Sequence, residues 1–292
     1  MKRVCVIVAT VGRPEALRTL LGHLQRQTLQ PQSVILSLEK EEDCPALDGL
    51  TIPIKAVYGP RGLCQQRNRG LDASPQDSDI VAFFDDDYVP SRYALEGIVA
   101  AFERFPAAGG MNGVLLADGI NGPGIDLHEA ARTVEAVDLQ RKSSSPNMLG
   151  RLQGLYGCNM VYRASAIGGE RFDEALPLYG WQEDIDFSAR LKGDKIKTDA
   201  FYGVHCGTKS GRETKGKRLG YSQIANNWYL LRKGTMTPRH ALGLASSNVV
   251  ANHLKMLNPE PWIDRRARAA GNWAALADLV RGRCTPARML KL

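Results

Sequence analysis

Three consecutive aspartates at residues 85–87 follow directly on the apolar run Ile80–Phe84. Adjacent carboxylates repel one another, and at the end of a buried strand they are costly unless a cation compensates for their charge. In an extended segment, Asp85 and Asp87 would point to the same side. Two carboxylates on one side suit Mg²⁺ or Mn²⁺, ions that also take phosphate oxygens as ligands. A solvated acidic turn before the next helix is the alternative interpretation.

A second acidic group occurs in the segment Tyr179–Phe187, which also contains the aromatic Trp181. Its carboxylates Glu183 and Asp184 come directly before a short helix that we expect over Ile185–Leu191. The dipole of a helix favours negative charge at its N-terminus, so such a carboxylate stays ionised. An ionised carboxylate beside a substrate hydroxyl can act as a general base. An ordinary helix cap is the alternative interpretation.

Two arginines and one histidine are candidates to complete such a site. Arg13 follows the first predicted strand, and Arg67 lies in the segment Gly62–Gly70 ahead of the aspartates. A guanidinium can pair with a phosphate or with a carboxylate of the site. His205 follows a predicted strand, Thr198–Tyr202, and is interpreted either as a metal ligand or as a structural residue. The sequence lacks the glycine-rich motifs of P-loop and dinucleotide-binding proteins, which argues against both classes.

The elements that must position these residues are strands that alternate with helices. We expect strands at Val4–Ala9, Val34–Leu38, Ile54–Tyr58 and Ile80–Phe84, and helices at Glu15–Thr28, Gly62–Leu71 and Ser91–Phe105. The alternation indicates a mostly parallel sheet flanked by helices. Ligands of such sheets bind beyond the carboxyl ends of the strands, where Thr10–Arg13, Glu39 and Asp85–Asp87 are found. We also expect Ser91 to be the N-cap of the third helix.

The composition of the 292-residue chain is that of a globular protein, with 43% hydrophobic and 24% charged residues. The sequence contains no apolar run of the length that a membrane-spanning helix needs. The short apolar run near the N-terminus is followed by no small-residue cleavage site, so we interpret it as a buried strand. Six scattered cysteines without a CxxC pair are typical of free thiols in a reducing compartment. We therefore expect a cytoplasmic protein.

The charge of the chain is divided unevenly along its length. Residues 1–207 carry a net charge of −5, whereas residues 208–292 carry +12. Basic segments with tryptophan, Trp262–Arg268 and Trp273–Arg283, are typical of helices that lie on anionic membranes. We expect either peripheral membrane association of this region or helices packed with solvated basic faces, and no nucleic-acid partner. The run Lys209–Arg218 is a candidate lid over a bound pyrophosphate, and a solvated flexible connector is the alternative interpretation.

Taken in this order, the motifs resemble those of family 2 glycosyltransferases with the GT-A fold, of the type found in bacterial polysaccharide biosynthesis. The resemblance covers about residues 2–207 and is carried by Val6–Leu17, Gly62–Gly70, Ile80–Pro90, Gly157–Arg163 and Gln182–Asp184. It implies an α/β fold with a GT-A-type, Rossmann-like sheet. The implied organisation is a catalytic domain over residues 1–207 and a basic helical extension over residues 208–292.

The resemblance also implies a role for each candidate residue. Asp87 and His205 would bind a divalent metal, Mn²⁺ or Mg²⁺. Asp184 would be the catalytic base, Glu183 would help to position the acceptor, and Trp181 would stack on a sugar face. The nucleotide-sugar would be bound by Thr10, Arg13, Glu39, Arg67, Asp85 and Asp86. Because many members have an aspartate where Glu39 stands, the identity of the nucleotide stays open.

The reaction that we expect is transfer of a sugar from a nucleotide-sugar, with a UDP-sugar as first choice, to a glycan or lipid-linked glycan. A single base on the face opposite the leaving group predicts inversion at the anomeric carbon. The enzyme would act in the cytoplasm, either free or peripheral on the cytoplasmic face of the inner membrane. The alternatives are a nucleotidyltransferase of related fold and a non-catalytic sugar-binding protein.

Overall fold

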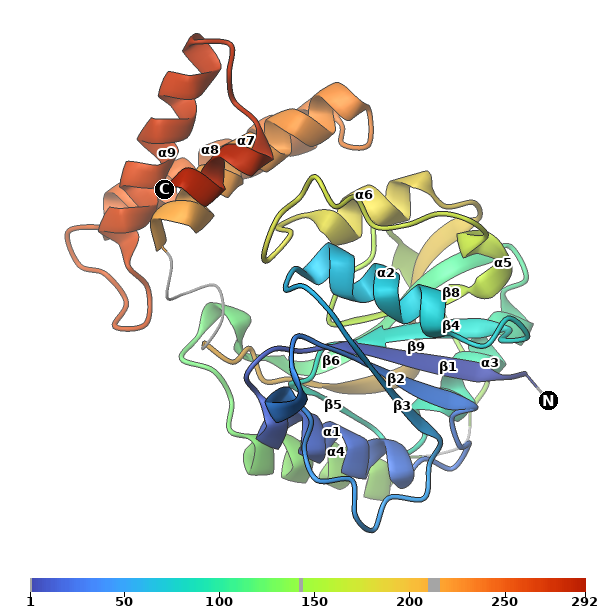
Figure 1. Cartoon of the computed structure of the whole chain (residues 1–292). Coiled ribbons are helices and arrows are strands. Elements are labelled where there is room, and N and C mark those ends of the chain that lie inside the picture. Colours follow the sequence, from blue (N-terminus) through green and yellow to red (C-terminus); the bar gives the residue numbers. More distant parts are fainter. Residues whose placement is uncertain (1, 142–143, 210–215) are drawn as a thin grey trace. The chain divides into compact units, whose positions relative to one another are not determined.

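The structure is a computed structural model that describes residues 2–141, 144–209 and 216–292. The chain divides into two compact units (Figure 1). Unit 1 comprises Met1–Arg61, Gln65–Arg171 and Leu191–Thr208, and unit 2 comprises Gly62–Cys64, Phe172–Arg190 and Lys209–Leu292. The segment Phe172–Arg190, which we placed in the catalytic domain from the sequence, thus groups with the C-terminal helices.

Unit 1 is built on one sheet, to which nine strands contribute within the described residues. The strands are β1 Val4–Ala9, β2 Ser33–Leu38, β3 Ile54–Tyr58, β4 Ile80–Phe84, β5 Tyr88–Pro90, β6 Ala108–Asp118, β7 Met148–Arg151, β8 Asn159–Arg163 and β9 Asp194–His205. Their order is β3-β2-β1-β4-β8-β6-β9-β5, and β7 pairs with β9. The predicted strands at residues 4–9, 54–58 and 80–84 have the predicted bounds.

The sheet is parallel where the sequence alternates between strand and helix. Strands β3, β2, β1 and β4 pair in parallel, as do β6 and β9. Strand β8 is antiparallel to both β4 and β6, and β5 and β7 are antiparallel to β9. The carboxyl ends of β1, β2 and β4 therefore meet at one edge, as we expected.

Helices cover both the parallel strands and the later part of the sheet in unit 1. They are α1 Pro14–Gln25, α2 Leu63–Ala73, α3 Ala94–Arg104, α4 Leu127–Gln140 and α5 Ala164–Ile167, with 3₁₀ turns η1 Glu41–Asp43 and η2 Gly119–Asn121. Helix α1 buries Leu17, Leu20, Leu21 and Leu24, the face that the sequence spacing predicts. Within α2, the residues from Gln65 onward belong to unit 1.

The prediction that Ser91 caps the third helix is wrong. Helix α3 begins at Ala94, and its N-cap residue is Tyr93. Ser91 is buried and donates its hydroxyl to the carboxylate of Asp138 in α4, at 2.6 Å. Its oxygen still accepts the N–H of Tyr93 at 3.1 Å, so the hydroxyl bridges Asp138 to the segment before α3 and does not occupy the N-cap position.

Unit 2 consists of helices α6 Glu183–Arg190, α7 Gly216–Lys233, α8 Pro238–Lys255 and α9 Arg265–Val280, followed by the 3₁₀ helix η4 Pro286–Lys291. Its core is formed by Tyr221, Ile224, Ala225, Ala275 and Met289. Among the described helices, none combines the length and the apolar character needed to cross a bilayer.

Helices α7 and α9 approach each other through glycine. A Cβ atom on Gly220 of α7 would lie 2.0 Å from the carbonyl oxygen of Arg268. A Cβ atom on Gly271 of α9 would lie 2.1 Å from the carbonyl oxygen of Lys217. Because the clashing atoms are backbone on both sides, a side chain at either position forces the helices apart.

We expect Gly271→Ala to lower the stability of unit 2 by about 1–3 kcal/mol, the usual cost of overpacking. Chemical denaturation followed by circular dichroism measures this loss. The matched control is Gly243→Ala in α8, where no atom lies within 4 Å of the added Cβ. The control variant should gain about 0.5–1 kcal/mol from helix propensity. Equal effects of the two substitutions would contradict this account of the packing.

Candidate active site

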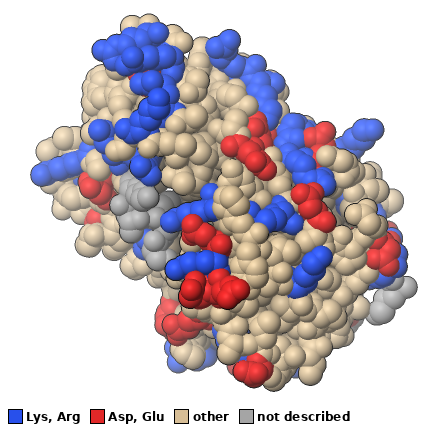
Figure 2. Space-filling view, in the orientation of Figure 1, with Lys and Arg blue, Asp and Glu red and all other residues tan. Residues whose placement is uncertain are grey.

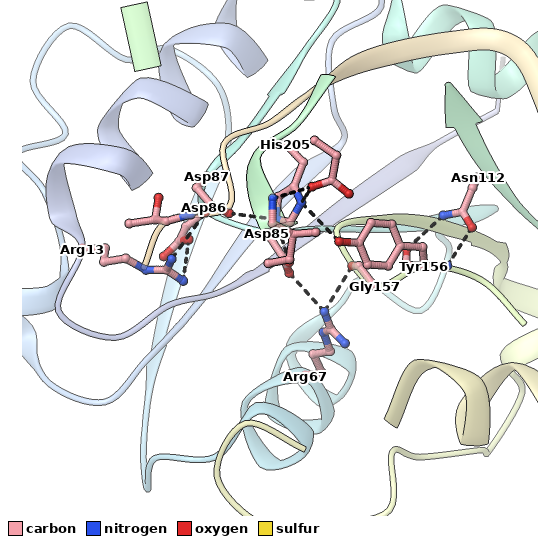
Figure 3. Close-up of polar contacts among 12 residues, drawn as sticks. Arg13, Arg67, Asp85, Asp86, Asp87, Asn112, Tyr156, Gly157 and His205 are labelled. Atoms are coloured by element: carbon pink, nitrogen blue, oxygen red, sulfur yellow. Dashed lines mark hydrogen bonds and ion pairs between the residues drawn. The ribbon is translucent and has the colours of Figure 1, made fainter. Parts of the chain in front are cut away.

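The parallel strands of unit 1 bring two of the predicted segments, Thr10–Arg13 and Asp85–Asp87, together at one edge of the sheet. Figure 3 shows Arg13 beside the aspartates. Thr10 follows β1, and Asp85–Asp87 follow β4. The buried Gln66 of α2 donates to the carbonyl oxygens of Thr10 (2.9 Å) and Ser37 (2.8 Å). Its amide therefore fixes α2 against the carboxyl ends of β1 and β2.

The aspartate segment is a turn and not the extended segment that we assumed. The N–H of Asp85 donates to the carbonyl of Cys158 (3.1 Å), and the N–H of Tyr88 donates back to the carbonyl of Asp85 (3.0 Å). The turn sends the side chain of Asp86 toward Arg13, whereas Asp85 and Asp87 both approach His205 (Figure 3).

Asp86 holds two of the predicted nucleotide-binding residues in place. Its carboxylate forms an ion pair with Arg13 at 2.8 Å and accepts a hydrogen bond from the hydroxyl of Thr10. Asp86 is fully buried, and burial raises its pKa above the ordinary value, although the charge of Arg13 acts in the opposite direction. Arg13 also lies 3.6 Å from a carboxylate oxygen of Asp87. The guanidinium is thus held beside two aspartates.

The register of the sheet places His205 between Asp118 of β6 and the aspartate turn that precedes β5. His205 is opposite Tyr88 of β5 and opposite Asp118 of β6. Its Nδ1 lies 2.8 Å from Oδ1 of Asp118. Its Nε2 faces the other way, 3.6 Å from Asp87 Oδ1 and 4.0 Å from Asp85 Oδ2.

The charges around His205 outweigh the effect of its burial. Burial by itself would lower the pKa of this imidazole, but the hydrogen bond to Asp118 and the charges of Asp87 and Asp85 raise it above the ordinary value. Burial likewise opposes the ionisation of Asp87. His205, Arg13 and the N–H of Thr208, which donates to Asp87 at 2.7 Å, together keep the pKa of Asp87 below its usual range.

The residues present fit a divalent cation. Asp85, Asp87 and His205 each offer one ligand atom, and these atoms lie within 4.8 Å of one another. Two carboxylate oxygens and one imidazole nitrogen suit Mn²⁺, and the carboxylates suit Mg²⁺. Asp118 occupies Nδ1 and so leaves Nε2 to act as the ligand atom, which is the usual arrangement around metal-binding histidines.

Asp118 is the residue that sequence reasoning missed. It ends β6 without a recognisable motif, and it is separated from His205 by 87 residues. Only the pairing of β6 with β9 brings the two together. The sequence offered only an aspartate at the end of a long strand as a sign of this role. An aspartate in that position is equally typical of a helix N-cap, so it could not identify a partner of His205.

Arg67 is buried and connects α2 to the aspartate turn. Its Nη2 lies 3.1 Å from Asp85 Oδ1 and 3.2 Å from the carbonyl oxygen of Gly157. The residue before Gly157 is in turn held by Asn112, whose side-chain amide donates to the carbonyl of Tyr156 at 2.9 Å and accepts from the N–H of Tyr156 at 2.7 Å (Figure 3). Both sides of Asp85 are therefore fixed.

Glu39 lies outside this group of contacts. It is exposed at the end of β2. The nearby acid that packs inward is Asp43, which is buried and accepts a hydrogen bond from the N–H of Gly12 at 2.8 Å. Of the candidate lid, residues 210–215, which include Arg212 and Lys215, lie outside the described residues.

The predicted base belongs to unit 2, where Glu183 and Asp184 begin α6. The carboxylate of Asp184 accepts a hydrogen bond from the N–H of Ile185 at 2.8 Å. The loop before α6 has left-handed backbone at two non-glycine residues, Leu178 (φ 56°) and Gln182 (φ 74°). Such conformations are costly and concentrate at functional sites.

Helix α6 is anchored to the end of α7 by charge. The buried Asp186, two residues after the predicted base, lies 2.9 Å from Lys233 Nζ and accepts the hydroxyl hydrogen bond of Thr235 at 2.7 Å. The carbonyl oxygen of Trp181 accepts from the amide of Asn226 in α7 at 2.8 Å. The position of Asp184 within unit 2 is therefore set on both sides.

We expect Asp118→Asn to lower the Mn²⁺ affinity of the protein about 10–100-fold, because the variant loses the carboxylate that orients His205. Isothermal titration with Mn²⁺ measures the change. The control is Asp77→Asn, an exposed aspartate paired with Arg3, for which we expect the affinity of the unmodified protein. Unchanged Mn²⁺ affinity in Asp118→Asn would mean that Asp118 does not support a metal ligand.

The geometry can be compared with known proteins. The sequence model of the family described as Glycosyl transferase family 2 matches residues 5–167. Among solved structures, the crystal structure of S. aureus TarS 1–349 is similar at a TM-score of 0.50 and 13% identity, and the match covers 96% of this chain and 92% of that one. The crystal structure of S. aureus TarS has the same TM-score and identity, with 98% and 55% covered. No curated protein matches the sequence.

Proposed function

The chain belongs to glycosyl transferase family 2, and on this premise we propose that it is an inverting, metal-dependent enzyme that moves a sugar from a nucleotide-sugar to a hydroxyl acceptor. Glycosyltransferase activity follows from membership of this family. The alternative prediction of a nucleotidyltransferase is therefore set aside. The observation that supports the finer proposal is the group formed by Asp85, Asp87 and His205, with Arg13 beside it.

On the donor side, the chemical problem is the negative charge that develops on the departing nucleoside diphosphate. A divalent cation held by Asp85, Asp87 and His205 would supply Lewis-acid stabilisation of that charge. Arg13 adds a guanidinium that the ion pair with Asp86 orients in advance, so little entropy is lost when a phosphate binds. Besides the one ligand atom that it offers to the cation, Asp85 is assigned to the ribose or sugar of the donor.

The remaining donor contacts are proposed on the strength of their place at the strand ends. Thr10 lines the nucleotide pocket next to Arg13. Arg67 supports it by holding Asp85. Glu39 is assigned to the nucleotide base, since it is exposed at the end of β2 and is free to meet a ligand from solvent. A UDP-sugar is the expected donor.

On the acceptor side, we propose that Asp184 takes the proton of the attacking hydroxyl. Asp184 lies in the first turn of α6, and proton removal during bond formation contributes about 10²–10⁴-fold to the rate. Glu183 would orient the acceptor, and Trp181 would stack on a sugar ring. A single base and no nucleophilic residue imply inversion at the anomeric carbon.

The proposed acceptor is a glycan or lipid-linked glycan in bacterial polysaccharide assembly. The basic C-terminal region supports an acceptor at the cytoplasmic face of the inner membrane, because a net charge of +12 over residues 208–292 attracts an anionic surface. No nucleic-acid partner is proposed.

We expect Asp184→Asn to reduce sugar transfer about 10²–10⁴-fold, while the Kd for the donor stays within about twofold. Nucleotide release measures transfer, and calorimetry measures donor binding. Glu174→Gln, which changes an exposed carboxyl group in the same segment, serves as the control and should retain activity. Full activity of Asp184→Asn would disprove the assignment of the base.

A thermal-shift panel of UDP-, GDP-, dTDP- and CMP-sugars, with and without Mn²⁺, tests the donor site. Binding at 100 times Kd stabilises the native protein by about 2.7 kcal/mol. We expect a metal-dependent shift for one nucleotide, and its loss in Asp87→Ala and in Asp87→Asn, which keeps the side-chain volume. Asp48→Asn, at an exposed position, should shift normally. A shift that persists in both Asp87 variants would refute the metal role.

A further inference from the structure

Helix α8 exposes apolar side chains where a surface helix usually carries charges. Leu242, Val250 and Leu254 are separated by multiples of four residues, and Leu257 follows just after the helix. Their exposed fractions are 66%, 53%, 71% and 84%. Residues at this spacing lie along one side of a helix. We call these four residues the α8 leucine face.

The other side of α8 is turned to its neighbours: Ala241 and Asn252 are buried there, and Val249 packs against the core of unit 2. Asn252 is fully buried, and its amide donates to Gln223 of α7 (2.8 Å) and to Asn272 of α9 (2.9 Å). Asn248 accepts from the amide of Gln223 at 2.7 Å. Arg265 of α9 donates to the side-chain oxygen of Asn252 at 3.1 Å. Hydrogen bonds therefore attach α8 to its neighbours, and the leucine face takes no part in that attachment.

The serine hydroxyls on the outer side of α8 are hydrogen-bonded to carbonyl groups of their own helix. The hydroxyl of Ser246 donates to the carbonyls of Leu242 (2.7 Å) and Gly243 (3.1 Å) of its own helix. The hydroxyl of Ser247 donates to the carbonyl of Leu244 at 3.0 Å. Hydroxyls that are bonded to the backbone cost less to remove from water. The outer side can thus be covered by an apolar medium without leaving these donors unpaired.

Cationic and aromatic groups surround the leucine face. Helix α8 contains no acidic residue, and Arg239 and Lys255 lie at its two ends. Trp273 of α9 is 63% exposed and packs edge-on against His253 of α8, with ring centroids 5.7 Å apart. Figure 2 shows further Lys and Arg atoms gathered over the C-terminal helices. The exposed leucines of α8, the exposed Trp273 of α9 and the basic side chains near them are residue types that proteins use to contact an anionic bilayer surface.

We propose that the α8 leucine face inserts into the surface of an anionic membrane and so attaches the enzyme to it. This proposal rests on the proposed function, whose acceptor lies at a membrane, and it names the surface that makes the contact. The charge of this region favours a membrane over a second copy of the chain as the partner of the leucine face. The +12 charge of residues 208–292 repels an identical region, whereas it attracts anionic lipid.

Co-sedimentation of the full chain with vesicles tests the proposal. The vesicles contain either phosphatidylcholine alone or equal parts of phosphatidylcholine and phosphatidylglycerol. We expect binding to the anionic vesicles, and a loss of about tenfold or more in the partition coefficient for the double variant Leu242→Ala, Leu254→Ala, which changes apolar area but no charge. The control is Leu139→Ala, Leu149→Ala, which removes two exposed leucines of unit 1 and should bind like the unmodified protein.

Three results would overturn the proposal. The first is no binding of the unmodified chain to anionic vesicles. The second is equal binding by both double variants, which would leave the basic side chains as the whole cause. The third is a dimer in light scattering that the α8 variant dissociates, without vesicle binding. The donor thermal shift, measured on the same samples, tests the proposed function separately: a retained shift without vesicle binding refutes only the membrane surface.

Discussion

Three adjacent carboxylates at the end of a buried strand raise the free energy of the folded state. The groups that compensate for them come from several elements of unit 1 and connect those elements. Asp86 and Asp87 are almost fully buried, and Asp85 is adjacent. Like charges in such a place raise the free energy of the folded state unless cations neutralise them. The chain supplies the guanidinium of Arg13 to Asp86 and that of Arg67 to Asp85, and it places the imidazole of His205 beside Asp87. Each of these groups comes from a different element, so the contacts with the turn also tie those elements together.

The same requirement explains why the later strands β5, β6 and β9 matter to the site. A βαβ sheet alone carries residues of β1, β2 and β4 to the common edge. The pairing of β9 with β5 and β6 adds His205 and Asp118 from the other side. With Asp118 on Nδ1, the imidazole presents Nε2 to the two carboxylates. The site is therefore built by both halves of the mixed sheet.

Unit 2 follows a different rule, because its helices are joined by glycine contacts and amide hydrogen bonds. Gly220 and Gly271 let α7 and α9 approach to backbone contact. Gln223, Asn252 and Asn272 then fill the interior around α8 with paired polar groups. A helix that is attached through its polar side leaves its leucines outside. The apolar surface of α8 is thus a consequence of how the unit is held together.

The sequence by itself determined the strands at residues 4–9, 54–58 and 80–84, the buried face of α1, and the family. Each of these depends on neighbours in the chain, through side-chain period and local motif. Only the tertiary structure decided that residues 85–87 form a turn, that Ser91 lies before α3 and donates to Asp138, and that Asp118 orients His205. It also decided which side of α8 is buried. These contacts join residues distant in sequence, and their energies depend on burial and strand register, which no local pattern contains.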